Sequence, residues 1–563
     1  MNHPGLLARF VALALLAGCG GSDVAVNPPP GPAPIVPPVP PAAQVTTAEA
    51  FRFLNQASFG ATSAEAQRLI ALGDATTAYS RWIDSQVALA PSLHLPTVLS
   101  AYDALAQGTP PGSVHADRVE VWLRHAVTAP DQLRQRVAFA LSEIMVISQV
   151  GGLQQLPLAT TDYYDILVRN AFGNYRRLLE DVTLSPAMGV YLSMLGNEKP
   201  DVARNIRPDE NYAREAMQLF TVGLVELSGD GSVRLDGQGQ ALPTYNQEVI
   251  EGFANVYTGW KWAWTGAGAP SFTAVRPGRA NQMLPMQVYP ERHSTGTKRL
   301  LGATVLPAGQ TPQKDLADAL DSLFAHPNVG PFIARQLIQR LVTSNPSPAY
   351  VGRVAAVFNN DGSGARGNLA AVVRSILLDS EARSAPATDT AGKMKEPLLR
   401  LTQLWRAFDA RATNGRFLVQ PANTFGQGPL QAPSVFNFFS PGYGPPGEIA
   451  DRNLVAPELQ IATEYLNTSV TNYLYNQVFG RTSAVPGQPD TAVVLDVSAE
   501  LAVIGDSATL VDRIAGKLLG GQISATLRSQ ARTLVESRTA SDPQRVAEAL
   551  YLVVTSPEFA LQR

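Results

Sequence analysis

The chain is almost without cysteine: Cys19 is the single thiol among 563 residues. Without a second thiol the protein can form no internal disulfide, and the folded part can hold neither a thiolate zinc site nor a covalently attached c-type haem. The stability of the folded part therefore has to come from side-chain packing.

Charge of one sign is equally scarce. The formal net charge is −3, charged residues make up 16% of the chain, and no tail of concentrated charge is present. A chain of this kind has no global field that would attract a polyanion, so we predict no nucleic-acid partner. Its 45% hydrophobic share is typical of a globular protein, not of a disordered one.

Motifs of common catalytic and nucleotide-binding sites are missing as well. The chain has no Gly-x-Ser-x-Gly, Walker loop, dinucleotide fingerprint or EF-hand loop in a usable context. His115, His125 and His326 lack metal-ligand spacing such as His-x3-His. We therefore predict no metal and no cofactor, and the sequence by itself does not decide whether the protein is an enzyme.

The start of the chain carries the pattern of a bacterial lipoprotein. After Arg9 and a short apolar stretch, residues 16–19 read Leu-Ala-Gly-Cys, which is a lipobox. The resemblance to lipoproteins implies that residues 1–18 are a signal peptide and that Cys19 is acylated, so that two or three acyl chains anchor the protein in a membrane. A plain secretory signal is the alternative. Gly20 is not the aspartate that retains lipoproteins in the inner membrane, so we expect the outer membrane of a Gram-negative cell envelope.

Proline concentrates in the segment that follows, residues 19–46, which includes the run Pro-Pro-Pro-Gly-Pro at 28–32. Proline fixes φ and favours an extended polyproline helix. We therefore predict a semi-rigid stalk between Cys19 and the folded part. A ligand for a proline-reading module is the alternative.

Helical periodicity dominates the rest of the chain. Residues 224–235, with a Ser-Gly-Asp-Gly turn, have the pattern of a β-hairpin, and Thr244 with Gln247 has the spacing of a capping box. Apolar residues recur at i, i+3, i+4 spacing in 47–57, 130–148, 208–223, 313–326, 330–343, 349–358, 367–379, 394–409, 456–478 and 508–556. We predict one large, mainly α multi-helix globular domain over 47–563, with one small β-hairpin and long loops. Any subdomain boundary would fall near 385–393.

Four polar residues on adjacent turns of the predicted helix 208–223 are binding or catalytic candidates: Glu210, Asn211, Arg214 and Glu215. An arginine keeps a neighbouring carboxylate ionised and oriented, so this set can bind a sugar or polarise a carbonyl. The same spacing also gives an ordinary i, i+4 ion pair between Glu210 and Arg214, and the sequence favours this structural interpretation.

The long loop 259–302 supplies the other candidates. His293 stands near Lys298, and an imidazole of ordinary pKa, about 6.5, is available for proton transfer at neutral pH. No nucleophile or partner acid accompanies it in the sequence, and a loop-tying hydrogen bond is the commoner role.

Three tryptophans alternate in the same loop: Trp260, Trp262 and Trp264. In an extended segment their indoles would share one face and could stack on a sugar. Burial in the core is the commoner fate of tryptophan and is the alternative.

Several segments resemble one bacterial family in both order and spacing. They are FRFLNQASFGAT (51–62), ENYAREAMQLFTVGL (210–224), YNQEVIEGFANVYTGW (245–260), HSTGTK (293–298), HP (326–327) and PSVF (433–436). The chain is similar to the domain of unknown function 1800 family over nearly everything after the stalk. The resemblance implies a secreted or envelope protein, and it points to a sulfatase-like family, domain of unknown function 1501, as a source of envelope partners. It implies no activity.

The chain departs from this family at one place. Many members resemble a Trp-His-x-His-Phe pattern in the helix that corresponds to 130–148, whereas residues 141–145 here read Leu-Ser-Glu-Ile-Met. The two histidines that could be metal ligands are missing, so a metal site in those members does not transfer to this chain.

We expect an envelope-anchored lipoprotein that binds a protein partner or a surface polymer such as a polysaccharide. The alternative is a cofactor-free hydrolase or lyase that acts on envelope or extracellular polymer through His293 and either Glu210 or Glu215. The surroundings of His293 separate the two: an open pocket with a carboxylate favours the enzyme, and a sealed interior favours binding.

Overall fold

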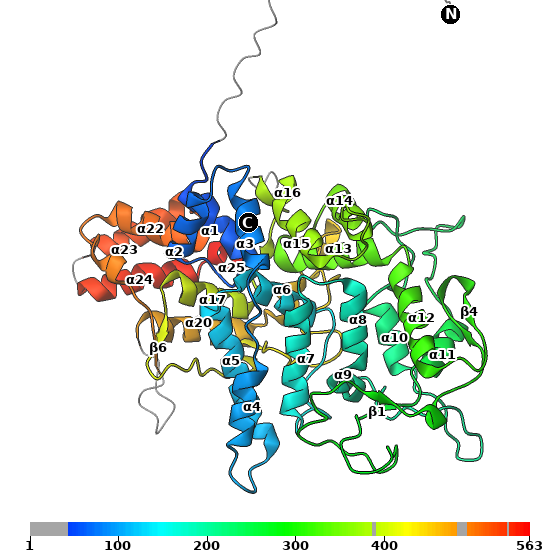
Figure 1. The fold of residues 1–563 in the computed structure, drawn as a ribbon. Coiled ribbons are helices and arrows are strands. Elements are labelled where there is room, and N and C mark those ends of the chain that lie inside the picture. Colours follow the sequence, from blue (N-terminus) through cyan, green and yellow to red (C-terminus); the bar gives the residue numbers. More distant parts are fainter. Residues whose placement is uncertain (1–42, 385–389, 481–491, 538–539) are drawn as a thin grey trace, which may run out of the picture. The chain divides into compact units, whose positions relative to one another are not determined.

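A computed structural model describes residues 43–384, 390–480, 492–537 and 540–563. Residues Ala43–Arg563 form one unit. The lipobox with Cys19, the signal peptide and the proline-rich stalk up to residue 42 lie outside the described residues, as do residues 385–389 of the segment where a boundary was expected. The described chain is mainly α, as predicted (Figure 1).

The first part of the fold is entirely helical. Its elements are α1 (Thr47–Ala57), α2 (Ser63–Ala71), α3 (Ala78–Val87), α4 (Leu95–Asp103), the 3-10 helix η1 (Pro111–Val114), α5 (His115–Thr128), α6 (Gln132–Ser142), α7 (Pro157–Asn170), α8 (Tyr175–Leu184) and α9 (Pro186–Tyr191). The start of α1 follows from a capping box, in which Thr46 accepts from the amide of Glu49 and Glu49 accepts from that of Thr46. The helix begins where the sequence places it.

Helix α6 is shorter than predicted, because the chain leaves the helix at Glu143. Residues 144–147 keep an apolar pattern only because they are buried on every side after the helix has ended. Tyr163 donates a hydrogen bond of 2.5 Å to the carbonyl oxygen of Met145, which satisfies one of the backbone groups exposed by the turn. The apolar pattern in the sequence continues beyond Ser142, and for this reason the predicted helix extends past the end of α6.

The middle of the chain mixes helices with very short strands. Its elements are α10 (Asn211–Gln218), α11 (Gln247–Val256), β1 (Trp260–Lys261), β2 (Gln287–Val288), η2 (Pro290–Arg292), β3 (Lys298–Arg299), η3 (Leu301–Ala303), β4 (Val305–Leu306), α12 (Pro312–Ala325), α13 (Val329–Leu341), α14 (Pro348–Asn359), α15 (Leu369–Leu378) and α16 (Ser380–Arg383). Asn246 caps α11, not Thr244 as the capping-box spacing predicted, because Thr244 turns away to the carbonyl oxygen of Gly223.

The hairpin at 224–235 forms, but only as isolated antiparallel bridges, one of which joins Leu227 to Val233. Leu224, Val233 and Leu235 are exposed, so these apolar side chains of the hairpin do not pack against the core. A two-stranded hairpin without such packing is only marginally stable, which explains the irregular pairing. The hairpin is also not the only β structure of the described chain, although the sequence predicted no other. Four antiparallel pairs of two-residue strands occur in the described chain, and strands of that length show no periodicity in a sequence.

The last part returns to helices. Its elements are β5 (Lys393–Met394), α17 (Pro397–Ala407), β6 (Arg411–Ala412), α18 (Pro421–Phe425), α19 (Glu448–Asp451), η4 (Pro457–Ile461), α20 (Glu464–Val478), β7 (Val493–Val494), α21 (Ser498–Leu501), α22 (Ser507–Leu519), α23 (Ala525–Glu536), α24 (Asp542–Val554), α25 (Pro557–Ala560) and β8 (Leu561–Gln562). The predicted helix 508–556 is three helices; Gly520, at φ 58°, ends the first of them in the left-handed conformation.

The two ends of the described chain meet. Figure 1 shows α1, in blue, beside α22, in orange, which in turn contacts α25, in red. Strand β5 pairs with β8, and the Nε of Arg52 donates to the main-chain oxygen of Arg563 over 3.1 Å. One hydrophobic core runs through nearly all the helices from α1 to α25, and two small clusters flank it. None of the helices described here has the length and apolar character needed to cross a bilayer.

Candidate functional site

The polar residues of α10 hold two helices together at the surface. Arg214 Nη2 lies 2.6 Å from Glu210 Oε2 and donates to Gln247 Oε1 on α11 over 3.0 Å. Gln247 Nε2 returns a hydrogen bond of 2.9 Å to Glu210 Oε1. Asn211 lies exposed at the start of α10. The predicted i, i+4 ion pair is present, and Glu210, Arg214 and Gln247 use their polar groups on one another.

Glu215 points the other way, into the protein. It is 9% exposed, its Oε2 has no hydrogen-bond partner among the described residues, and burial raises the pKa of its carboxyl group, with Arg214 opposing. Burial, and after it the charge of Glu215, raises the pKa values of Tyr191 and Tyr245, so these phenols lie near Glu215. The sequence-predicted set is thus divided between two sides of α10.

His293 and Lys298 meet at one buried carboxylate, Asp315 of α12. His293 Nε2 lies 2.9 Å and Lys298 Nζ 2.7 Å from Asp315 Oδ2, and all three side chains are at most 1% exposed. The other ring nitrogen, Nδ1, is 2.9 Å from the carbonyl oxygen of Thr258. Both ring nitrogens of His293 therefore face oxygen acceptors, and neither is free to act as a general base on a ligand.

The three tryptophans do not form a surface platform. Trp260 is 4% and Trp262 5% exposed, and they belong to different hydrophobic clusters. Trp264 is half-buried against the cluster of Trp262. In this conformation the indoles of Trp260 and Trp262 cover the interior under the long loop and cannot stack on a sugar.

Sequence reasoning missed a buried group of charges at the end of α6, here called the sealed cluster: Glu143, Arg340, Lys393, Glu396 and Glu458. Lys393 Nζ lies 2.9 Å from Glu458 Oε1 and 3.4 Å from Glu396 Oε1. Arg340 Nη2 donates to the carbonyl oxygen of Glu143 over 2.9 Å. The five residues come from four separate segments, and only the contact of Lys393 with Glu396 joins residues that are close in the sequence, so the cluster as a whole could not have been predicted.

Two carboxyl groups of the sealed cluster share a hydrogen bond, and their pKa values move in opposite directions. Burial and the neighbouring Glu396 raise the pKa of Glu143 well above its usual value. Burial opposes the ionisation of Glu396, but the charges of Lys393 and Arg136, with hydrogen bonds from Glu143 and Gln427, together outweigh it and lower the pKa of that carboxyl group. The pair therefore carries one proton on Glu143 and one charge on Glu396. All five residues are at most 3% exposed, so we assign the cluster to the fold.

An open cavity of about 730 Å³ lies between α5 and the segment 416–431, and we call it the α5 cavity. Helix α5 provides Asp117 and Glu120, and Tyr473 of α20 contributes the aromatic wall. The segment opposite is anchored to α5, because the amide of Phe417 donates to Glu120 Oε1 over 3.3 Å. Four side-chain amides also line it: Gln149, Gln420, Asn423 and Gln431.

The charged side chains that line the α5 cavity are paired. Asp117 Oδ1 lies 2.6 Å from Arg416 Nη2, and Glu120 Oε1 lies 3.4 Å from Arg124 Nε. Burial, together with the charge of Arg118, lowers the pKa of His115 to about 3, so this wall histidine is neutral at physiological pH. The cavity is polar without presenting an unpaired charge at its wall.

Hydrogen-bonding capacity is left over in the α5 cavity. Gln431 Oε1 is buried and has no partner among the described residues. Arg118, behind the wall, donates to the side-chain oxygen of Gln149, which polarises that amide and makes its NH2 group a stronger donor. Amides that offer both donors and acceptors, set beside one aromatic ring, match the hydroxyl groups and the apolar face of a sugar.

The sequence contains a weak signal for this site. Gln420, Asn423 and Gln431 stand close together in a segment with few apolar residues, but amides of this density are also usual in plain loops. Asp117 and Gln149, which line the same cavity, are hundreds of residues away. No group of three or more His, Cys, Asp or Glu side chains suited to a metal ion occurs in the described part of the chain.

Comparison with known proteins gives a family and no function. No curated protein and no solved structure matches the chain. The model of one family, described as Protein of unknown function (DUF1800), matches residues 52–561. That match covers nearly the whole of the described fold, as the resemblance of the sequence segments predicted, and the chain therefore belongs to the DUF1800 family.

Proposed function

We propose that this protein is a lipid-anchored envelope protein that binds a neutral saccharide polymer in the α5 cavity. The observation that carries the proposal is the lining of that cavity: paired charges, four side-chain amides, of which Gln431 has a buried oxygen without a partner, and the ring of Tyr473. A charged polymer would meet no unpaired charge at the wall, whereas a neutral sugar needs none.

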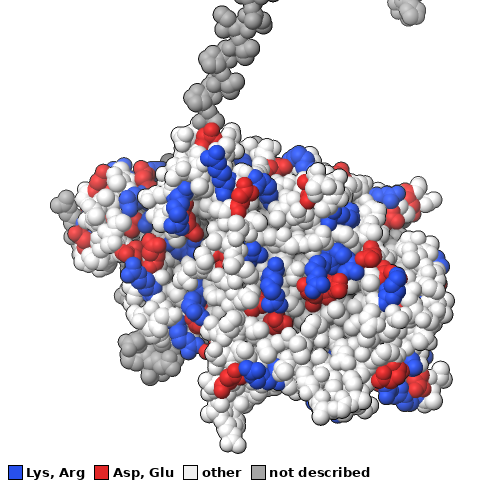
Figure 2. Space-filling view, in the orientation of Figure 1, with Lys and Arg blue, Asp and Glu red and all other residues white. Residues whose placement is uncertain are grey.

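The visible surface agrees with a neutral ligand. Figure 2 shows lysine and arginine side chains interleaved with aspartate and glutamate on the face drawn, without a broad region of one sign. The formal net charge of −3 supplies no attraction for an anionic chain either. Binding to a neutral saccharide should consequently change little between 50 mM and 500 mM salt.

The paired carboxylates favour binding over hydrolysis. A glycosidase needs one carboxyl group that keeps its proton and a second that is free to act as a base or nucleophile. Asp117 is held by Arg416, and Glu120 is held by Arg124 and the amide of Phe417. The sealed position of His293 likewise supports binding over the hydrolase considered from the sequence.

A glycan array with the full-length chain in detergent tests the proposal. Wild type should retain neutral envelope glycans, and Tyr473→Ala should weaken that binding about two- to tenfold, since an aromatic contact contributes ~0.5–1.5 kcal/mol. Asn423→Ala, at an exposed cavity position, should weaken it less. The matched control is Tyr465→Ala, because Tyr465 lies on the same helix, 72% exposed, outside the cavity.

Two results on the array would overturn the saccharide assignment. One is equal glycan binding by wild type and a folded Tyr473→Ala variant. The other is retention of anionic glycans alone, with affinity that falls as salt rises. Capture of a sulfatase-like protein partner in place of any glycan would also contradict it.

The anchor is tested separately. Cys19→Ser removes the thiol that would carry the diacylglycerol, so the variant should move from the membrane fraction to the soluble fraction. Mass spectrometry of the wild-type N-terminal peptide should find acyl chains on Cys19. An unmodified thiol there would contradict the lipoprotein proposal, but it would not affect the proposal of saccharide binding in the α5 cavity.

A further inference from the structure

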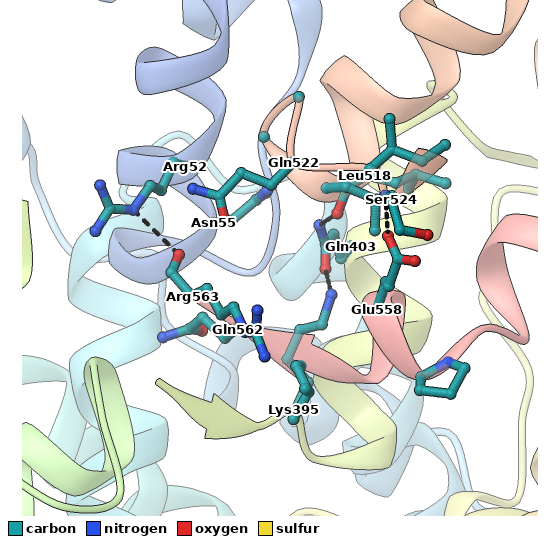
Figure 3. Close-up of a pocket in the computed structure, with 16 residues that line it drawn as sticks. Arg52, Asn55, Lys395, Gln403, Leu518, Gln522, Ser524, Glu558, Gln562 and Arg563 are labelled. Atoms are coloured by element: carbon teal, nitrogen blue, oxygen red, sulfur yellow. Dashed lines mark hydrogen bonds between the residues drawn. The ribbon is translucent and has the colours of Figure 1, made fainter. Parts of the chain in front are cut away.

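A second cavity, of about 520 Å³, lies where the two ends of the described chain meet, and we call it the β8 cavity. Its wall comes from α1, α17, the turn after α22, and the segment from α25 to β8. Figure 3 shows Lys395 at one side of it, with its amine directed toward Gln403. The cavity is separate from the α5 cavity and shares no lining residue with it.

Lys395 is buried in this wall without a counter-ion. It is 5% exposed; its Nζ donates to Gln403 Oε1 over 2.6 Å and lies 3.9 Å from the ring centre of Phe559. No carboxylate in the described part of the chain forms an ion pair with it. An amide oxygen and a ring face are acceptors that suit a neutral amine as well as an ammonium ion.

The surroundings favour the neutral amine. Burial, and then the charge of Arg400, lowers the pKa of Lys395 well below its usual value. A buried amine that faces a cavity and has a lowered pKa is the arrangement by which proteins obtain a nucleophilic lysine. The amides of Asn55 and Gln522, which line the same cavity, can bind hydroxyl groups of a small ligand.

We propose that the β8 cavity binds a small hydroxyaldehyde covalently, as an imine on Lys395. The neutral Nζ attacks the carbonyl carbon and forms a C–N bond, while the carbonyl π electrons move to oxygen, which takes up a proton. The resulting carbinolamine loses its hydroxyl group as water, and the nitrogen gives up its remaining proton as the C=N bond forms. Amine and aldehyde thus give imine and water, with no oxidant or reductant.

Gln403 is the positioning residue for this step. Its side-chain oxygen holds the amine, and its Nε2 is fixed by donation to the carbonyl oxygen of Leu518 over 2.9 Å. An amide at this place orients Nζ without stabilising the ammonium form as a carboxylate would. Gln403→Glu should therefore restore the proton to Lys395 and slow imine formation, although Lys395 itself is unchanged.

The test is reductive trapping with glycolaldehyde and cyanoborohydride at pH 7, applied to the full-length chain and read by peptide mass spectrometry. Lys395 should be labelled at least about ten times faster than Lys314, because one unit of pKa changes the free-amine fraction tenfold. Lys314 is the internal reference, since it is solvent-exposed and paired with Asp318. Gln403→Glu should lower labelling of Lys395 about tenfold and leave that of Lys314 unchanged.

Three results would overturn the proposal. One is labelling of Lys395 no faster than that of Lys314. Another is equal labelling of Lys395 in wild type and in a Gln403→Glu variant whose circular dichroism matches wild type. The third is glycolaldehyde that protects the cavity from amine reagents but leaves no adduct after reduction, which would make the cavity a non-covalent site. None of these results bears on saccharide binding in the α5 cavity.

Discussion

Two lysines that stand two residues apart have opposite surroundings. Lys393 is enclosed in the sealed cluster, with Glu458 Oε1 at 2.9 Å and Glu396 Oε1 at 3.4 Å. Lys395 has an amide oxygen, a phenyl ring and a cavity in place of any carboxylate. A buried charge that has a buried counter-charge has a structural role, because removing either partner leaves the other unpaired in the interior. An amine without a counter-charge beside a cavity is available to a ligand.

The same contrast holds for carboxylates. Asp315 is fully buried against Lys298 and His293, in a place that no ligand could reach without unfolding the loop over it. Asp117 and Arg416 pair at the partly exposed wall of the α5 cavity. Substitutions in the sealed interior should therefore change stability, and substitutions at the cavities should change binding.

The largest effect is expected from comparing Lys393→Met with Lys395→Met. The first strands Glu396 and Glu458 in the interior and should destabilise the protein by about 3–5 kcal/mol. The second leaves no carboxylate unpaired and packs an apolar chain against Phe559, so its cost should stay below ~1.5 kcal/mol. Urea denaturation measures both. Equal losses would break the distinction between the two lysines.

A smaller loss, about 3 kcal/mol, is expected for Asp315→Asn, which keeps the shape of the side chain but leaves the ammonium group of Lys298 unpaired. Asp318→Asn is the matched control on the same helix, because its partner Lys314 is exposed; it should cost less than ~1 kcal/mol. If Asp315→Asn kept full stability, His293 and Lys298 would not depend on that carboxylate, and a catalytic role for His293 would return.

A pH-dependent effect on the order of 1 kcal/mol is expected for Glu143→Gln. The raised pKa of Glu143 means that the unfolded chain loses this proton first as pH rises. Its contribution is complete below pH ~4.5 and declines as pH climbs toward the folded pKa. Glutamine keeps a donor for Glu396 and cannot ionise, so the variant should gain stability over wild type between pH 5 and 8.

Glu396 supplies the opposite control for this experiment. Its lowered pKa means that it stabilises the fold above the unfolded pKa and loses that contribution as pH falls. Glu396→Gln should therefore lose stability most at neutral pH. Melting temperatures measured across the range should diverge in opposite directions for the two variants, and parallel curves would contradict the assignment of the shared proton to Glu143.

The sequence predicted what local physics determines. Thr46 and Glu49 define the start of α1 through contacts three residues apart, and Glu210 with Arg214 forms the ion pair that i, i+4 spacing predicts. Both structures depend on neighbours along one helix. Such features, together with the mainly α class, could be predicted without coordinates.

What could not be predicted depends on contacts between distant segments. Glu143 and Glu396 share a proton although 253 positions separate their numbers, and Lys395 meets Phe559 only because the C-terminal strand β8 pairs with β5, far from it in the sequence. Trp262 is a further example: the alternation of tryptophans placed it on one face of the segment but could not show whether that face is exposed or buried. Burial and pairing of this kind are tertiary properties, and a single sequence carries no periodic trace of them.

The smallest effect is expected at the residue that sequence reasoning ranked among its catalytic candidates. Glu210→Gln breaks an exposed ion pair and should change the free energy of unfolding by less than ~1 kcal/mol. It should also leave glycan binding unchanged, because Glu210 lies outside both cavities and its two carboxylate oxygens already accept from Arg214 and Gln247. Urea denaturation and the glycan array measure the two quantities on the same sample. A tenfold loss of glycan binding in this folded variant would transfer the saccharide site from the α5 cavity to the surface of α10, since no change at an already satisfied ion pair can weaken a ligand that does not touch it.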